Sequence, residues 1–227
     1  MVSHESSMPR RAGRPAATSR AQILAAARRL IERDGWQRLT IRSLASELGI
    51  GATTLYHHVR DRDDLLIQLL NDHASQTQSP PLPDDPGARI VVAGAAIRDT
   101  LASWPWAAEV LTTDGFVGRL GGSALWMVEA IVAGATDAGC SRTQAVEVFR
   151  HIWFYTVGEI LVRSRSRKAS ASDASGTFFM AIDARTMPHL AAIGNDWPVI
   201  AARDSFREGL EAFVDGLLRR YAKREAR

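Results

Sequence analysis

The sequence predicts an all-α protein with an N-terminal three-helix helix-turn-helix domain and a larger helical domain. Apolar residues recur at spacings of three and four along most of the 227 residues, which is the period of a helix with one buried face. An apolar content of 46% is enough for a proper core in one or two domains. No apolar run approaches the length of about 18 residues that a membrane-spanning helix needs.

The stretch 39–66 predicts two short helices joined by a Gly-Ile-Gly turn, followed by the start of a third helix. Thr40 stands where an N-cap belongs, since its hydroxyl can accept a backbone N–H of the first turn. Gly49 follows the last apolar residue of the first helix and can adopt the left-handed conformation that ends it. Ile50 is expected to turn inward as a plug between the two helices.

Two further helices complete the expected N-terminal domain. Residues 20–34 form a companion helix with one apolar side, which ends at Gly35. Asp61, with Asp64 three residues later, predicts a capping box for the helix that follows the turn. A core shared by about 50 residues would be marginal alone, so packing on the rest of the chain is expected to matter.

The second helix of the pair has an outer face of hydroxyls, a phenol and imidazoles. The residues that carry these groups are Thr53, Thr54, Tyr56, His57 and His58. A short helix with such a face is suited to a polar partner, and the helix-turn-helix arrangement indicates the major groove of DNA.

An ordered set of residue types over residues 20–70 resembles the DNA-binding domain of the TetR family of bacterial transcriptional regulators. The set comprises the helix 20–34 with Gly35, Leu39-Thr40, Leu44-Ala45 through Gly49-Ile50, Thr54-Leu55-Tyr56 and His58-Val59. Beyond residue 70, Pro105-Trp106, the helix 142–164 and the closing FREGLEAFVDGLL are similar to the C-terminal half of the family's namesake. The resemblance implies a dimeric repressor that a small molecule releases from its operator.

Groove chemistry suggests a role for each exposed residue of the motif. Tyr56 is expected to give its hydroxyl to a phosphate, with Thr40 and Thr54 placed to do the same. The resemblance implies that Arg42 reaches a base edge, where a bidentate contact with guanine is the natural pairing. Candidates for reading bases or phosphates are Thr53, His57 and His58, and Arg62 is expected to contact the DNA backbone. For each of them the alternative is an ordinary exposed helix residue.

The charge distribution agrees with a DNA partner. Residues 1–62 hold 11 Arg and no Lys against 5 Asp and Glu, and the remainder holds 17 basic against 20 acidic residues. The basic charge therefore lies on the same part of the chain as the motif, as attraction to phosphates requires. Residues 1–19 are expected to form a disordered basic arm, which either lies in the minor groove or is a plain solubilising tail.

The chain is expected to divide into the arm 1–19, the DNA-binding domain 20–70, a linker 71–87 and a ligand-binding and dimerisation domain 88–227. The linker is predicted from four prolines and from the loss of helical spacing among its apolar residues. This spacing returns in residues 88–227, where helices are expected at 88–104, 106–112, 123–138, 142–164, 187–193 and 201–223.

Two of these helices suit self-association. The helix 142–164 is apolar on more than one face, and a surface helix needs only one apolar stripe. Pairing it and the last helix with their copies in a twofold-related chain would form a four-helix interface. Such a homodimer places two recognition helices about 34–36 Å apart and predicts a palindromic operator.

The larger domain is also expected to contain a pocket for a small hydrophobic effector, because it has more large aromatic rings than a plain core needs. The candidate ligand-binding residues are Arg98, Trp104, Trp126, Glu129, His151 and Tyr155. Each of the polar ones is more often a surface or satisfied core residue. The sequence contains no histidine set comparable with that of the tetracycline repressor, so neither tetracycline nor magnesium is implied, and we expect no metal and no cofactor.

Other classes of protein fit the sequence less well. No catalytic triad order, zinc spacing or phosphate-binding glycine loop indicates an enzyme. The lone Cys140 excludes an intramolecular disulfide and fits a reducing cytoplasm, and the N-terminus lacks the apolar segment of a secretory signal. The alternatives that stay open are an activator built from the same parts and an architectural DNA-binding protein without a ligand response.

Overall fold

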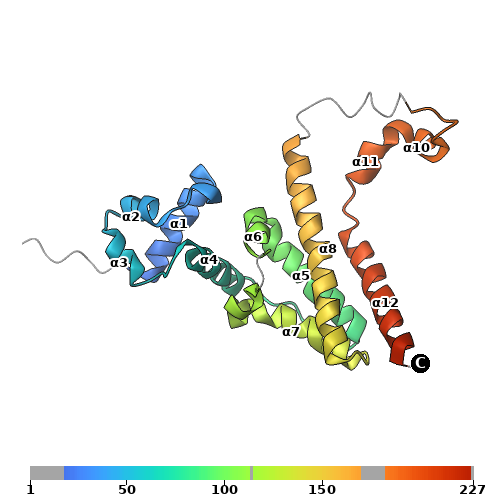
Figure 1. The fold of residues 1–227 in the computed structure, drawn as a ribbon, viewed down its shortest axis with the longest axis horizontal. Helices are drawn as coiled ribbons and strands as arrows, with labels where there is room; N and C mark the ends of the chain where they lie inside the picture. The colour runs from blue at the N-terminus through green and yellow to red at the C-terminus, as the bar shows by residue number, and fades with distance from the viewer. Residues whose placement is uncertain (1–17, 113–114, 170–181, 226–227) are drawn as a thin grey trace, which may run out of the picture. The chain divides into compact units, whose positions relative to one another are not determined.

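The computed structural model of the chain describes residues 18–112, 115–169 and 182–225, and all regular elements in these ranges are helices (Figure 1). The all-α prediction is therefore confirmed. The chain divides into two compact units, Met1–Leu65 and Leu66–Arg227. Among the described helices, none combines the length and the apolar character that crossing a membrane requires.

The first unit contains the expected three-helix arrangement. Its elements are α1 (Arg20–Asp34), η1 (Trp36–Arg38), α2 (Ile41–Leu48), α3 (Ala52–Tyr56) and the first turn of α4 (Arg62–Gln76). The core is formed by side chains that are fully or almost fully buried: Ile23, Leu39, Leu44, Leu55 and Leu65. Arg33 of α1 forms an ion pair of 3.3 Å with Glu47 of α2 across the outside of this core.

Local capping chemistry fixes the helix ends. Thr40 caps α2 by accepting from the N–H of Ser43, and Gly49 ends α2 in the left-handed region at φ 65°, both as predicted. At α4 only half of the predicted capping box forms: Asp61 accepts from the N–H of Asp64 at 2.7 Å. The Asp64 carboxylate accepts from the N–H of Arg60 instead, one residue earlier than a capping box requires.

The predicted arm ends earlier than expected. Ser19 is the N-cap of α1 and forms a complete capping box with Gln22, so it belongs to the first unit. Residues 1–17 of the arm lie outside the described part of the chain.

The second unit continues α4 and adds nine further described elements. They are α5 (Pro86–Ala102), α6 (Pro105–Val110), η2 (Phe116–Arg119), α7 (Gly122–Asp137), α8 (Arg142–Ala169), α10 (Pro188–Ile193), η3 (Gly194–Asp196) with α11 (Trp197–Ala201), and α12 (Phe206–Glu225). The short elements η2, η3 and α11 are too brief to give a periodic signal. The last helix starts five residues later than predicted, because Asp204 and Ser205 precede it as an N-terminal turn.

The predicted linker 71–87 is corrected at both ends. Helix α4 continues to Gln76, since Ala74 is buried on the same face as Leu70. A single small alanine gives little hydrophobic periodicity, which explains why the sequence did not reveal this extra turn and a half of helix. The remaining segment is anchored by Arg89, which donates to the carbonyls of Pro83 and Asp84 and pairs with Asp137 at 2.6 Å.

Helices α5, α7, α8 and α12 pack together around the main core (Figure 1). Residues of each helix are completely buried there, among them Ile90, Ile131, Ile152 and Leu210. At Gly134 the helices approach so closely that an added Cβ would lie 2.8 Å from the carbonyl oxygen of Pro86 and 2.8 Å from the side chain of Ile90. A glycine at this position permits the α5–α7 contact.

Replacing Gly134 with alanine is therefore expected to destabilise the second unit by about 1–3 kcal/mol, the usual cost of overpacking. Gly216→Ala is the matched control, because nothing lies within 4 Å of a Cβ at that position of α12. There the higher helix propensity of alanine should stabilise by up to about 1 kcal/mol. Denaturant unfolding measures the free energy of unfolding of both variants. Equal changes in the two variants would contradict the close approach of α5 and α7 at Gly134.

Candidate nucleic-acid interface and ligand pocket

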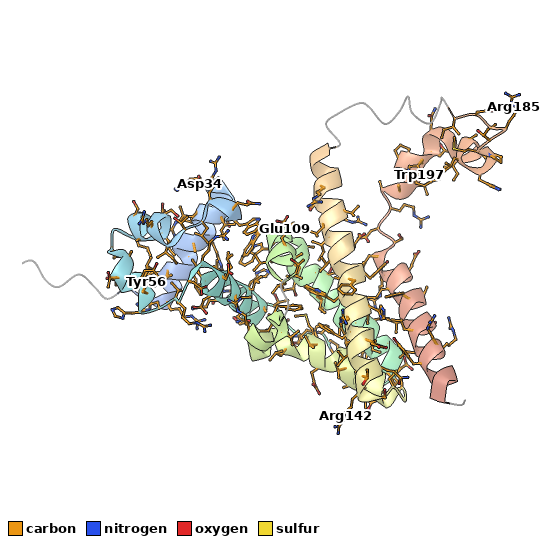
Figure 2. The ribbon with its side chains drawn as sticks, in the orientation of Figure 1. Asp34, Tyr56, Glu109, Arg142, Arg185 and Trp197 are labelled. Atoms are coloured by element: carbon orange, nitrogen blue, oxygen red, sulfur yellow. The ribbon has the colours of Figure 1, made fainter. Side chains whose placement is uncertain are left out.

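Helix α3 presents a polar surface held in place by one apolar anchor. Leu55 is completely buried, whereas Thr53, Thr54 and Tyr56 on the same helix are exposed. The Tyr56 ring is 57% exposed even though it is a large side chain (labelled in Figure 2). The five-residue helix thus turns its hydroxyls and phenol outward, as the sequence predicted.

Two of the predicted reader residues lie just beyond this helix. Helix α3 ends at Tyr56, so His57 and His58 are not on it, which corrects the sequence prediction. His57 is the C-cap and keeps helical backbone angles, while the N–H of His58 bonds to the carbonyl of Leu55 at 2.8 Å. Both imidazoles are exposed beside Tyr56 in sequence, so the polar surface extends into the turn.

The start of α2 contributes two more candidates. The Thr40 hydroxyl accepts from the N–H of Ser43 at 3.0 Å and is exposed. The same hydroxyl donates to the Oγ of Ser43 at 3.1 Å, so a phosphate would have to compete for this O–H. Arg42 is exposed and forms no ion pair among the described residues. Its guanidinium is therefore available to an acceptor outside the chain.

Arg62 differs from the expectation. Its Nε donates to the carbonyl of Leu39 at 2.8 Å and its Nη2 donates to the carbonyl of Trp36 at 2.7 Å. The guanidinium also lies over the Trp36 ring, 5.0 Å from the centroid. These contacts tie the start of α4 to the loop between α1 and α2. The structure thus gives Arg62 a role inside the domain, and its contact with the DNA backbone stays a prediction.

The second unit contains a small apolar pocket. Its walls come from α4, α5, η2, α7 and α8, together with residues that flank α6 and η2. They are Leu70, Ala74, Ile97, Thr100, Leu101, Leu111, Phe116, Leu120, Ala124, Met127, Val128, Phe149 and Trp153. Thr100 brings the one side-chain hydroxyl to this lining. A lining of this polarity suits an apolar group.

A more polar groove adjoins the pocket and shares Ala74, Thr100 and Met127 with it. The groove adds Thr77, Gln78, Ser123 and the predicted ligand residue Trp126, among others.

Apart from Trp126, the predicted ligand residues do not line either space. Trp104 stacks between His73 at 4.3 Å and Trp106 at 5.4 Å. Glu129 is exposed on α7, and His151 is exposed on α8, where it lines a surface groove with residues of α12. In the described ranges no group of three or more His, Cys, Asp or Glu side chains is placed to hold a metal ion.

Arg98 and Tyr155, also predicted as ligand residues, instead hold the start of α12. Arg98 pairs with Asp204 at 2.6 Å and lies over the Phe206 ring. The Tyr155 hydroxyl donates to the carbonyl of Phe206 at 3.3 Å, and burial, followed by the charge of Glu159, raises the pKa of Tyr155. Both side chains thus have a partner inside the chain, because burying a polar group without a partner is unfavourable.

The ion pair at Asp204 predicts a pH effect. The hydrogen bond from Arg98 holds the pKa of the Asp204 carboxyl below its usual value. A lowered pKa means that the stabilisation is present above the ordinary aspartate pKa and is lost as the pH falls through the lowered one. Asp204→Asn should cost less than about 1 kcal/mol at pH 7, because half of the side chain is exposed.

The free energy of unfolding, measured from pH 7 into the acid range, checks this prediction. The difference in this free energy between Asp204→Asn and wild type should shrink as the pH falls. Asp215→Asn is the control, because its exposed pair with Arg219 stays within α12. A difference that does not depend on pH would contradict the electrostatic origin.

The pocket residues themselves were missed because the sequence gives no signal that separates them from core. Leu70, Ala74 and Met127 lie on buried helix faces like any core residue. Only the distances between the helices decide which of these faces enclose a space, and these distances depend on side chains far apart in the sequence.

Comparison with known proteins agrees with both units. Residues 23–69 match the family described as bacterial regulatory proteins, tetR family. Residues 80–221 match the family described as tetracyclin repressor-like, C-terminal domain.

Individual relatives span most of the chain. An HTH-type transcriptional regulator of Saccharopolyspora erythraea is 30% identical over 182 residues, which cover 79% of this chain and 72% of that protein. The tetracycline repressor protein class A from transposon 1721 of Escherichia coli is 28% identical, over 87% of this chain and 89% of the repressor. The fold is similar to that of ActR from Streptomyces coelicolor in complex with actinorhodin, with a TM-score of 0.72 at 22% identity, covering 89% and 98% of the two chains. From its matching families and relatives, the chain belongs to the TetR family of bacterial transcriptional regulators.

Proposed function

We propose that this protein is a cytoplasmic, dimeric repressor that binds a palindromic DNA operator and is released by a small hydrophobic ligand. The exposed polar surface of α3, anchored by the buried Leu55, is the observation that carries the DNA-binding part of the proposal. Among its relatives is a protein named as a tetracycline repressor, which supports repression rather than activation.

Specific roles follow for the exposed residues of this surface. Tyr56 and Thr54 contact phosphates and set the register, with Thr40 contributing from the start of α2. Arg42 reads a base edge, and its lack of an ion pair within the described chain supports this role. The remaining exposed residues, Thr53, His57 and His58, distinguish one operator from another. The basic arm adds contacts in the minor groove.

The ligand part of the proposal rests on the apolar pocket. A purely architectural DNA-binding protein has no use for an apolar pocket lined by five different elements. The lining carries no charged side chain, so an ionised group would be poorly solvated inside it. The effector is therefore neutral over the part that enters the pocket. The adjoining groove, with Thr77, Gln78 and Ser123, supports a polar end on the same molecule.

The dimer part rests on exposed apolar side chains of α8. Val146, Phe154 and Val162 are 52%, 58% and 65% exposed. Phe154 also lines a groove with Phe213 and Tyr221 of α12. Helices α8 and α12 lie side by side in Figure 1. A twofold copy would cover these side chains and supply the second recognition surface that a palindrome requires.

Selection of DNA from random-sequence duplexes by the full-length protein tests this function. Wild type should recover a palindromic consensus. Arg42→Ala should weaken binding by about 1–3 kcal/mol and relax the preference at one position in each half-site. Tyr56→Phe should weaken binding of all sequences alike, because it removes a phosphate contact. Arg29→Ala is the control, since it removes the same charge from an exposed position of α1.

Failure to recover any consensus, with affinity that falls steeply with salt on every sequence, would instead identify an architectural DNA-binding protein.

A further inference from the structure

Helix α4 forms one wall of the apolar pocket and carries two polar side chains beside that wall. Leu70 and Ala74 face the pocket. Asn71 and His73, which lie between them in sequence, each bond to the backbone of another element that contributes to the lining. The pocket wall and these polar contacts are therefore parts of the same turn of helix.

Asn71 ties α4 to the segment that leads into α7. The N–H of Gly121 donates to its Oδ1 at 2.7 Å, and its Nδ2 donates to the carbonyl of Arg119 at 3.3 Å. Gly121 is the N-cap of α7, and it has no side chain to cap the helix itself. The carboxamide of Asn71 also packs on Gly121, where an added Cβ would lie 3.4 Å away. One side chain thus connects two elements that are 50 residues apart in the sequence.

The segment held by Asn71 is itself part of the pocket. Phe116 and Leu120, on either side of Arg119, line the same pocket as Leu70 and Ala74 of α4. A molecule that fills the space presses on both walls. Any widening between these walls has to stretch the two hydrogen bonds of Asn71, because they join the walls directly.

His73 holds the other side of α4 to α5. Its Nε2–H donates to the carbonyl of Thr100 at 3.1 Å, and its ring stacks on Trp104 at 4.3 Å. The side chain of Thr100 lines the pocket. With α4 fixed at His73, widening on the Asn71 side becomes a tilt or rotation of the helix rather than a simple translation.

We propose that Asn71 is the positioning residue that couples occupancy of the pocket to the orientation of α4, by stabilising the ligand-free arrangement. This rests on the proposed function, in which the ligand-free protein binds the operator. Asn71 lies on α4, which is one continuous helix from Arg62 to Gln76. The ligand-bound arrangement is the one in which the bonds to Arg119 and Gly121 are lost.

This role makes a prediction that a merely structural contact does not. In a two-state equilibrium, removing a contact made only in the ligand-free state favours the ligand-bound state. Ligand affinity then rises while operator affinity falls or stays unchanged. A variant that only loosened the fold would bind both partners more weakly. The opposite signs are the diagnostic result.

The test uses full-length protein with Asn71→Ala, Asn71→Asp and the control Gln76→Ala. Asn71→Asp keeps an acceptor for the N–H of Gly121 but loses the donor to Arg119. Gln76→Ala removes a hydrogen bond to Asp72 that stays within α4. The pocket is probed with the neutral fluorescent dye N-phenyl-1-naphthylamine, and operator affinity is measured with the duplex that wild type selects. Thermal unfolding monitors the fold.

We expect Asn71→Ala to bind the dye about fivefold to tenfold more tightly, the effect of two ordinary hydrogen bonds. Its operator affinity should fall by no more than the same factor, and Asn71→Asp should lie between it and wild type. Gln76→Ala should match wild type. Weaker binding of both dye and operator by Asn71→Ala, or no change in either, would overturn the role of Asn71 while leaving the proposed function intact. If wild type selects no duplex or binds no dye, the proposed function fails first.

Discussion

Arg62→Met is expected to destabilise the first unit by about 2–4 kcal/mol. The change removes two charge-assisted hydrogen bonds and a cation–π contact, whose combined contribution is reduced because the side chain is only partly buried. It also leaves the carbonyls of Leu39 and Trp36 without their partners. Methionine retains the apolar stem, so packing is changed as little as possible. The domain is small, so a loss of this size leaves it partly unfolded at moderate temperature.

Hydrogen exchange of the amides of α1 and α2 measures this local loss, together with operator binding at low temperature. Arg60→Met is the matched control, because that side chain is 80% exposed and its partner Asp64 keeps the bond from the backbone N–H of residue 60. It should change stability by less than about 0.5 kcal/mol. If Arg62→Met left exchange unchanged but weakened binding to all sequences with a smaller salt slope, Arg62 would be a phosphate contact after all.

The sequence was most informative where structure depends on neighbouring residues. The N-cap at Thr40 and the left-handed end of α2 at Gly49 were predicted correctly. Both depend on the chemistry of a few adjacent residues, since a cap needs only a side-chain oxygen three residues before a free N–H. The same local reasoning placed α5, α6, α7 and α10 within about two residues of their observed bounds.

Local reasoning was wrong where a side chain chooses between partners that are distant in the sequence. The sequence could not reveal that Arg62 would reach the carbonyls of Leu39 and Trp36, more than 20 residues away. Likewise Arg98 meets Asp204, 106 residues further along the chain. The sequence alone does not say whether a polar side chain on a predicted helix contacts solvent, a ligand or a distant residue of the chain.

The predicted linker shows a third limit. Asn71 and His73 fell in a segment without visible periodicity, so neither was considered as a site residue. Helix propensity there is sufficient, but the signal for a buried face is carried by Leu70 and Ala74 alone. That these two residues line a pocket is seen only in the structure, which brings them together with Phe116 and Leu120.

Phe154→Lys is expected to convert the dimer into a monomer at micromolar concentration. Phe154 is 58% exposed on α8 and lines the groove with Phe213 and Tyr221 of α12. The guanidinium of Arg150 lies over its ring, 5.6 Å from the centroid. A lysine would therefore place a second cation next to Arg150 in a surface that the partner desolvates, and burying an unpaired charge costs several kcal/mol. Sedimentation equilibrium measures the result.

Loss of the dimer should also change how the protein binds DNA. Two linked recognition surfaces bind a palindrome more tightly than one by a factor of about 10²–10⁴. The monomeric variant should therefore bind the full operator and a single half-site with similar, low affinity, although Arg42 and Tyr56 are intact. Val199→Lys is the control, because Val199 is 74% exposed but lies on α11 and not on α8. It should remain a dimer with unchanged operator affinity. If Phe154→Lys also remained a dimer, the twofold surface would not include Phe154, and the spacing of the two half-sites would have to be derived from another surface.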